Sequence, residues 1–200
     1  MMKATRLHLL RHGQVDGFES KRYNGQGDTR LTDFGRQQSA AFAGRFQQQK
    51  IRAIYSSDLF RCRFAADQIA MLQAVRPVYR EELRELHIGD WQGQTWQQLQ
   101  RDYPELWQAR LDDIVNVAPP SGESLLAMAR RVRPVIKQII SAHLGEEVVI
   151  VAHGGVNRVI LLDVIGAPLD RLFYIEQDFG CHNIIDYFAD GIAVVKKLNG

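Results

Sequence analysis

Short apolar runs alternate along the chain with longer segments in which apolar residues recur at helical spacing. The clearest run is EVVIVA at 147–152, where four consecutive strand-forming residues are typical of a strand buried on both faces. A short turn at 189–191 separates the last two runs, which predicts a terminal β-hairpin. The strands predicted in this way cover residues 5–10, 51–56, 77–79, 147–152, 184–188 and 192–198.

The segments between these strands predict helices. Pro104 requires a break or a new start in the third of them, and Pro134 is expected to kink or split the fourth. Thr32 is a suitable N-cap for the first helix, and Ser57 with Asp58 for the second. The predicted helices run from Thr32 to about Lys50, over 59–72, over 94–112, from 121–124 to about His143, and over 156–165.

Strands that alternate with helices are typical of an α/β fold with helices on both faces of a mainly parallel sheet. We therefore expect a three-layer α/β/α architecture with a mostly parallel sheet and an antiparallel C-terminal edge hairpin. Residues 1–200 are expected to form a single domain, because no internal repeat or low-complexity linker interrupts the pattern. In such sheets ligands bind beyond the carboxyl ends of the strands.

The composition narrows the classes of function. The 200 residues carry 25 basic and 23 acidic side chains, a net charge of +2, which gives no signal for nucleic-acid or membrane binding. Two cysteines exclude a disulfide framework and a four-cysteine zinc site. The N-terminal apolar part is too short and too broken for a signal peptide, so we expect a cytoplasmic protein. Of the basic residues, 19 are arginine, the side chain suited to two-pronged recognition of phosphate.

Three of the predicted strands end in residues suited to binding an oxyanion. The first strand ends in RHG at 11–13, and the clearest strand ends in HGG at 153–155. The second ends in SSD at 56–58, with Arg61 one turn further on. Because the carboxyl ends of parallel strands share one rim, arginines, histidines and glycine-freed N–H groups at these positions predict a phosphate site.

Six ordered sequence blocks resemble those of the histidine phosphatase superfamily, which has the phosphoglycerate-mutase-like fold. They are LHLLRHGQ at 7–14, GQGDTRLTDFGRQQ at 25–38, YSSDLFRCRFAA at 55–66, LRELHIGDWQG at 83–93, PPSGES at 119–124 and VVIVAHGGVNRVIL at 148–161. Together they span about residues 5–165 and are far more specific than any single motif.

The resemblance implies roles for individual residues. His12 is the expected nucleophile on phosphorus, and Glu85, four residues before Gly89, is the expected proton donor. His153 belongs to the same catalytic set. The expected ligands of the phosphoryl oxygens are Arg11, Arg61, His153 and the backbone N–H of Gly154. We expect no metal and no cofactor, because two arginines and a second histidine can stabilise the charge of the transition state.

The loop at 14–31 is long, as functional loops often are. The family often has an asparagine six residues after the nucleophile, a position that holds Phe18 here. Asn24 and Gln26 are the candidates to replace it at the substrate. Both this loop and the segment 86–118 carry aromatic residues. Helical spacing favours core packing for Trp96, Tyr103 and Trp107 of that segment. Stacking by Trp91, or by Tyr23 of the loop, would favour a ring-bearing substrate.

Two reaction types fit the resemblance. The stretch from Glu85 to His153 is compact and the segment 120–124 resembles the phosphatase branch, so we favour a phosphatase over a cofactor-dependent phosphoglycerate mutase. The expected partner is a small-molecule phosphomonoester. The short length of the chain is similar to that of alpha-ribazole phosphatases and of broad small-phosphoester phosphatases. The first similarity makes alpha-ribazole 5′-phosphate a candidate substrate. We expect no nucleic-acid or membrane partner, and an oligomer is left open. A non-catalytic protein that binds a phosphorylated ligand is a second alternative, but it would not need Glu85.

Overall fold

The computed structural model describes residues 3–200, in which six strands form one sheet. The strands are β1 (Thr5–Arg11), β2 (Ile51–Ser57), β3 (Val78–Arg80), β4 (Glu147–Ala152), β5 (His182–Tyr187) and β6 (Ala193–Lys197). Their order in the sheet is β3-β2-β4-β1-β5-β6. The first four of this order are parallel, and β5 pairs antiparallel with both β1 and β6. The predicted mostly parallel sheet with an antiparallel edge hairpin is confirmed.

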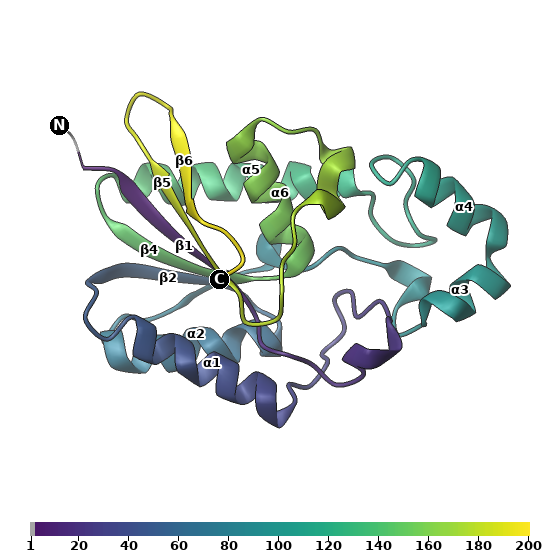
Figure 1. The fold of residues 1–200 in the computed structure, drawn as a ribbon, viewed down its shortest axis with the longest axis horizontal. Helices are drawn as coiled ribbons and strands as arrows, with labels where there is room; N and C mark the ends of the chain where they lie inside the picture. Colours follow the sequence, from purple (N-terminus) through teal and green to yellow (C-terminus); the bar gives the residue numbers. More distant parts are fainter. Residues whose placement is uncertain (1–2) are drawn as a thin grey trace.

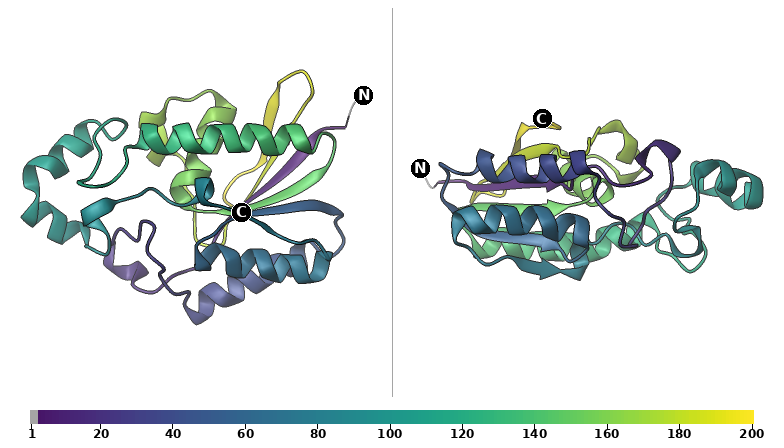
Figure 2. Two further views of the ribbon diagram at one scale, coloured as in Figure 1. Left: turned by 180° about the vertical axis from the view of Figure 1, so that it is seen from behind. Right: turned by 90° about the horizontal axis from the view of Figure 1, so that it is seen from below.

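Helices cover both faces of this sheet, which completes the three layers. The helices are α1 (Asp33–Arg45), α2 (Phe60–Gln73), α3 (Trp96–Asp102), α4 (Pro104–Asp112), α5 (Leu125–Ala142) and α6 (Gly154–Ile165). One face carries α1 and α2 and the other carries α5 and α6, as Figure 1 and the two views of Figure 2 show. Within residues 3–200 no helix is long and apolar enough to cross a membrane.

The alternation of side chains along β1 explains the two cores. Leu7 and Leu9 point to one face and pack with the apolar stripe of α5 and with α6. Leu10 points to the other face and packs with α1 and α2. All three side chains are fully buried, and burial of a leucine contributes about 1.5–3 kcal/mol. The two-residue period of the strand therefore fixes which helices lie on which face.

The helices α3 and α4 lie outside the three layers, beyond the end of the sheet where β1 finishes (Figure 1). They enclose a separate apolar cluster built on Ile88, Trp91 and Leu99, with Tyr103 and Trp107 packed against it. The core role expected for Tyr103 and Trp107 is confirmed. Trp91 is fully buried and so is not available to stack on a substrate, which leaves Tyr23 of the two residues considered for stacking.

The end of α1 and the cap of α2 differ from the predicted ones. α1 begins after its predicted N-cap, Thr32, but ends at Arg45 rather than near residue 50. Its fully buried neighbour Phe46 anchors the turn that leads into β2. The predicted capping of α2 by Ser57 and Asp58 is wrong: the N-cap is Leu59, without a side-chain cap, because Asp58 pairs with Arg84 instead.

The two prolines act differently. Pro104 starts α4 directly after α3, as predicted, because a proline at the first position of a helix loses no hydrogen bond. Pro134 does not split α5, which continues from Leu125 to Ala142. Pro134 lies on the exposed side of the helix, as does Arg130 four residues earlier, so water can solvate the carbonyl that the ring leaves without a donor.

Residues 166–181 carry no predicted helix or strand, yet they form hydrogen bonds to the carboxyl end of β1. A short 3₁₀ helix, η4 (Leu169–Tyr174), follows α6. The chain then returns to the end of β1, where the N–H of Arg11 donates to the Cys181 carbonyl at 3.1 Å. The N–H of Gly180 donates to the His12 carbonyl at 3.0 Å.

Candidate active site

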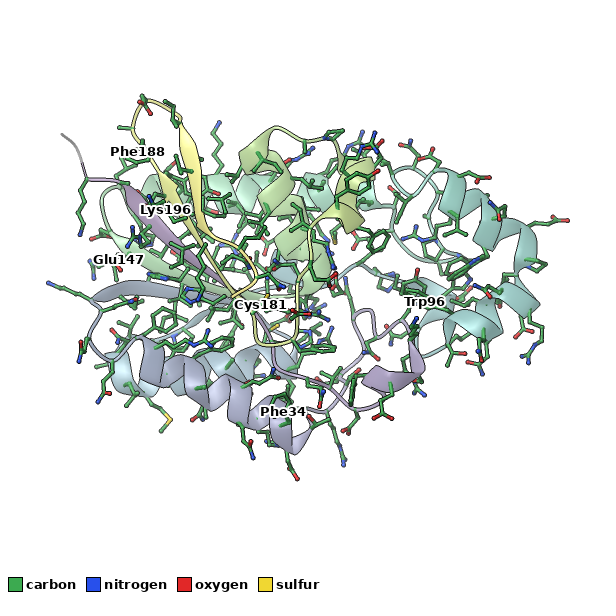
Figure 3. The ribbon with its side chains drawn as sticks, viewed as in Figure 1. Phe34, Trp96, Glu147, Cys181, Phe188 and Lys196 are labelled. Carbon is green, nitrogen blue, oxygen red and sulfur yellow. The ribbon has the colours of Figure 1, made fainter. Side chains whose placement is uncertain are left out.

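The carboxyl ends of three strands are level, as the sequence predicts. In the ladder Arg11 lies opposite Ala152, and Ser56 lies opposite Val151. The residues that follow these strands therefore meet on one rim, where a cavity of about 250 Å³ is lined by Arg11, His12, Arg61 and Glu85, among others. Two labels in Figure 3 locate the cavity. Cys181 lies beside the end of β1, and Trp96 lies on the opposite wall, which α3 and α4 form.

The ring of His12 is held in one tautomer. Its Nδ1 lies 2.8 Å from the carbonyl oxygen of Gly13. A carbonyl only accepts hydrogen bonds, so Nδ1 carries the proton and Nε2 keeps its lone pair. Burial and the positive charges of Arg61 and Arg11 hold the pKa of His12 well below its ordinary value. The imidazole is therefore neutral near pH 7, the form that can attack phosphorus.

Arg61 is oriented by three fixed acceptors. Its Nη1 donates to the Gly27 carbonyl and its Nη2 to the Gly25 carbonyl, each at 2.7 Å, and its Nε donates to His153 Nδ1 at 3.3 Å. A guanidinium has five N–H groups, so one on each terminal nitrogen stays free for an oxyanion. Burial lowers the pKa of Arg61, which remains a cation without an acidic partner in the described chain.

Arg11 is held on the other side of His12. Its guanidinium stacks on the ring of Phe179, with the central carbon 3.9 Å from the ring centroid, and its Nη1 donates to the Gln177 carbonyl. The buried Nε has no hydrogen-bond partner in the described chain. A buried donor without a partner is costly, so an oxyanion bound here would be stabilised by Arg11.

His153 lies behind the cavity rather than on its wall. Its ring centroid is 5.1 Å from that of His12, and the ring is fully buried. Because Arg61 Nε can only donate to Nδ1, the proton of the neutral ring sits on Nε2, which donates to Ser57 Oγ at 2.9 Å. Burial and the charge of Arg61 hold the pKa of His153 well below its ordinary value. In this arrangement His153 fixes Arg61.

The two glycines after His153 differ in position. Gly154, the expected phosphate ligand, lies against Arg11, and a Cβ there would lie 3.4 Å from the guanidinium carbon. It is Gly155 that lines the cavity, and its N–H donates to Glu85 Oε2 at 3.1 Å. A Cβ at Gly155 would lie only 2.3 Å from Glu85 Oε1, so the carboxylate needs a glycine here.

Glu85 is fixed through its carboxylate and through its backbone. The N–H of Leu86 donates to Oε1 at 2.8 Å, in addition to the bond from Gly155. Arg131 of α5 donates to the Glu85 carbonyl at 3.0 Å and is itself paired with Glu123. Glu123 also accepts from the N–H of His87 at 2.9 Å. The PPSGES block thus secures the segment that presents Glu85.

The two loop candidates separate in the structure. Asn24 lines the cavity beside Tyr23. Gln26 does not line it: its Nε2 donates to the Glu85 carbonyl at 3.0 Å, so Gln26 supports the backbone of Glu85 from behind. Phe18, at the position of the family asparagine, is 42% exposed and lies outside the cavity.

A nucleophilic imidazole, two guanidiniums and a carboxyl group on one rim match a phosphoryl-transfer site. The family model of the histidine phosphatase superfamily (branch 1) matches residues 7–199. The chain belongs to this superfamily. In residues 3–200 no group of three or more histidine, cysteine or acidic side chains is placed to hold a metal ion.

Relatives within the superfamily carry different names. A protein of Mycobacterium tuberculosis described as bifunctional is 34% identical over 196 residues, which cover 98% of this chain and 54% of that protein. The chain therefore spans about half the length of that relative. A glucosyl-3-phosphoglycerate phosphatase of Mycolicibacterium vanbaalenii is 36% identical over 180 residues, covering 85% of this chain and 78% of that one. The structure of the alpha-ribazole phosphatase from Shigella flexneri superposes with a TM-score of 0.90 at 26% identity, covering 98% and 96% of the two chains.

Several residues of this histidine phosphatase site had no signal in the sequence. Phe179 and Gln177 come from the unassigned segment that returns to β1, and Arg158 and Arg110 line the cavity from the middle of α6 and the end of α4. Ser57 did have a signal, in the SSD strand end and as a helix cap, but its contact with His153 was not predicted: its Oγ accepts from His153 Nε2 at 2.9 Å, and also from the N–H of Leu59 at 3.3 Å. Each of these contacts depends on how distant segments meet, which no local spacing reports.

Proposed function

We propose that this protein hydrolyses a small-molecule phosphate monoester through a phosphohistidine at His12, without a metal. The observation that carries the proposal is the tautomer of His12, whose Nδ1 is fixed to the Gly13 carbonyl at 2.8 Å while Nε2 has no partner in the described chain. A neutral Nε2 between two arginines without acidic partners is arranged to attack a phosphoryl group.

In the first step Nε2 attacks phosphorus while the bond from phosphorus to the ester oxygen breaks. Negative charge spreads over the phosphoryl oxygens, and Arg11 and Arg61 stabilise it with their free N–H groups. His153 keeps Arg61 in place through Nδ1. The protonated Glu85 carboxyl gives its proton to the leaving oxygen, which departs as an alcohol.

In the second step water attacks the phosphohistidine. The Glu85 carboxylate takes a proton from this water, the bond from phosphorus to Nε2 breaks, and inorganic phosphate leaves. His12 returns to its neutral form and Glu85 to its protonated form, so the cycle closes without a further reactant. One carboxyl group serves both steps, which is consistent with its four fixed contacts through the carboxylate and the carbonyl.

The substrate class rests on relatives that act on different esters. Two named phosphatase types match most of the chain, one for glucosyl-3-phosphoglycerate and one for alpha-ribazole phosphate. Both names support hydrolysis rather than the mutase reaction, and both support a phosphomonoester with a bulky non-reacting part. Alpha-ribazole 5′-phosphate is thus one candidate substrate within this class.

The test is phosphate release from a panel of phosphomonoesters in the presence of EDTA. The panel contains alpha-ribazole 5′-phosphate and glucosyl-3-phosphoglycerate, and a parallel sample of 3-phosphoglycerate is checked for its 2-isomer. We expect phosphate release that His12→Ala abolishes. Isomer exchange with little phosphate release would instead place the protein among the mutases.

A Glu85→Gln variant separates an enzyme from a protein that only binds phosphorylated ligands. Glutamine keeps the size and most hydrogen-bonding capacity of the side chain but has no proton to give. We expect the dissociation constant for inorganic phosphate to change by less than about threefold, and kcat for an alkyl phosphate to fall by about 10²- to 10⁴-fold. An unchanged kcat would contradict the role of Glu85.

A further inference from the structure

The cavity holds more positive charge than a phosphoryl group needs. Five arginines line it but only one carboxylate, that of Glu85. A phosphate monoester carries at most about two negative charges near neutral pH, and Arg11 and Arg61 already flank His12. Of the other three, Arg158 is paired with Glu176 at 3.5 Å, whereas Arg22 and Arg110 have no acidic partner in the described chain.

Arg110 is the member that the fold explains least. It lies in the last turn of α4, is only 4% exposed, and lines the wall opposite the strand ends. One of its nitrogens donates to the Val117 carbonyl, which secures the turn after α4, but the buried Nε has no partner. A buried guanidinium without a counter-charge is costly unless a ligand supplies one.

The neighbours of Arg110 define a second compartment of the cavity. Tyr23, Trp96 and Ile114 line the same wall, and Arg110 opposes the rise that burial causes in the pKa of Tyr23. The cavity of about 250 Å³ has room for much more than one phosphoryl group, since a water molecule occupies about 30 Å³ in the liquid. The space between His12 and Arg110 therefore suits the non-reacting part of a substrate.

The geometry points to a second anion subsite at Arg110, which selects phosphomonoesters whose non-reacting part carries a carboxylate or a second phosphate. This inference rests on the proposed function and narrows its substrate class. A guanidinium binds either anion through two parallel N–H bonds, and the carboxylate is the better match to a single planar fork. Arg110 acts here in specificity, away from the reacting atoms.

The test measures binding rather than turnover, so that its failure is distinct from a failure of the proposed function. Dissociation constants are measured by calorimetry for phosphonates of increasing chain length that end in a methyl group, a carboxylate or a second phosphonate. At the best length we expect the doubly charged ligands to bind about 10- to 100-fold more tightly than the methyl-ended one. The relative affinity of the carboxylate and phosphonate series identifies the second anion.

Variants then assign the preference to Arg110. Arg110→Gln is expected to reduce it to less than about threefold, and Arg110→Lys, which keeps the charge but not the fork, to leave an intermediate preference. Arg101→Gln is the matched control, because Arg101 lies in the neighbouring helix α3 and is 72% exposed. The inference is overturned if no chain length shows a preference, or if the preference survives in both Arg110 variants. If the wild-type protein released no phosphate but kept the binding preference, the proposed function would be contradicted and the inference about Arg110 would stand.

Discussion

The contact between Gly155 and Glu85 gives a prediction that separates catalysis from stability. Gly155 is the second residue of α6, and its φ is not in the left-handed region, so alanine fits the helix backbone. Alanine also raises the intrinsic helix propensity by about 0.5–1 kcal/mol relative to glycine. A Gly155→Ala variant should therefore fold with undiminished stability.

The added methyl group nevertheless collides with the carboxyl group of Glu85, the proposed proton donor. It would lie 2.3 Å from Glu85 Oε1, whereas ordinary contacts begin near 3.4 Å, so the carboxylate must move by about 1 Å. A displacement of this size costs about 10²-fold in rate, or about 2.7 kcal/mol of transition-state stabilisation. Arg11 and Arg61 do not touch the new methyl group, so phosphate binding should change by less than about threefold.

The assay compares kcat, the dissociation constant of phosphate and the melting temperature of Gly155→Ala with those of Gly44→Ala. Gly44 lies in α1, and a Cβ there meets no atom within 4 Å, so this control should match or exceed the wild type in all three. A Gly155→Ala enzyme with kcat within about threefold of the wild type would refute the placement of Glu85. A large loss of melting temperature would refute the claim that the helix accepts alanine.

Two further predictions follow from the surroundings of the site. Arg131→Gln removes the hydrogen bond to the Glu85 carbonyl. In steady-state kinetics we expect kcat to fall by about 10-fold while KM changes by less than about threefold. A rise in KM as large as the fall in kcat would contradict a positioning role for Arg131. The second concerns His182, whose pKa burial lowers to about 3. The unfolded chain binds a proton below about pH 6.5, so stability is full above that pH and is lost as the pH falls. Other buried histidines add to this loss, so urea unfolding between pH 7 and pH 5 should show the wild type losing about 2 kcal/mol more than His182→Asn. Equal losses in both proteins would contradict the prediction.

The sequence was sufficient for those parts of the fold that local pattern decides. The strand 147–152 has the predicted bounds because four apolar β-formers suit only a doubly buried position in a parallel sheet. The meeting of Arg11, His12 and Arg61 follows from the level carboxyl ends of parallel strands, which a prediction of strand order and direction already implies. Pro134 was misjudged because the effect of a proline depends on whether the freed carbonyl faces water.

The remainder of the site depends on contacts between distant segments. Gln26 has the polarity expected of a substrate ligand, but the loop turns its side chain toward the Glu85 carbonyl. Phe179 reaches Arg11 only because the segment after α6 returns to β1. The burial of Arg110 arises from the packing of α4, and an arginine at the end of a helix is ordinarily solvated. Contacts of this kind leave no periodic pattern in the sequence from which they could be predicted.

The central claim is that His12 carries the phosphoryl group between the two steps, and a burst measurement tests it most directly. In Glu85→Gln, 4-nitrophenyl phosphate still phosphorylates His12, because nitrophenolate leaves without a proton, while hydrolysis of the phosphohistidine is slow. We predict a rapid burst of about one nitrophenolate per protein, with mass spectrometry placing one phosphoryl group on the peptide that contains His12. Release of nitrophenolate without a burst, on a protein that never carries phosphate at His12, would contradict the account.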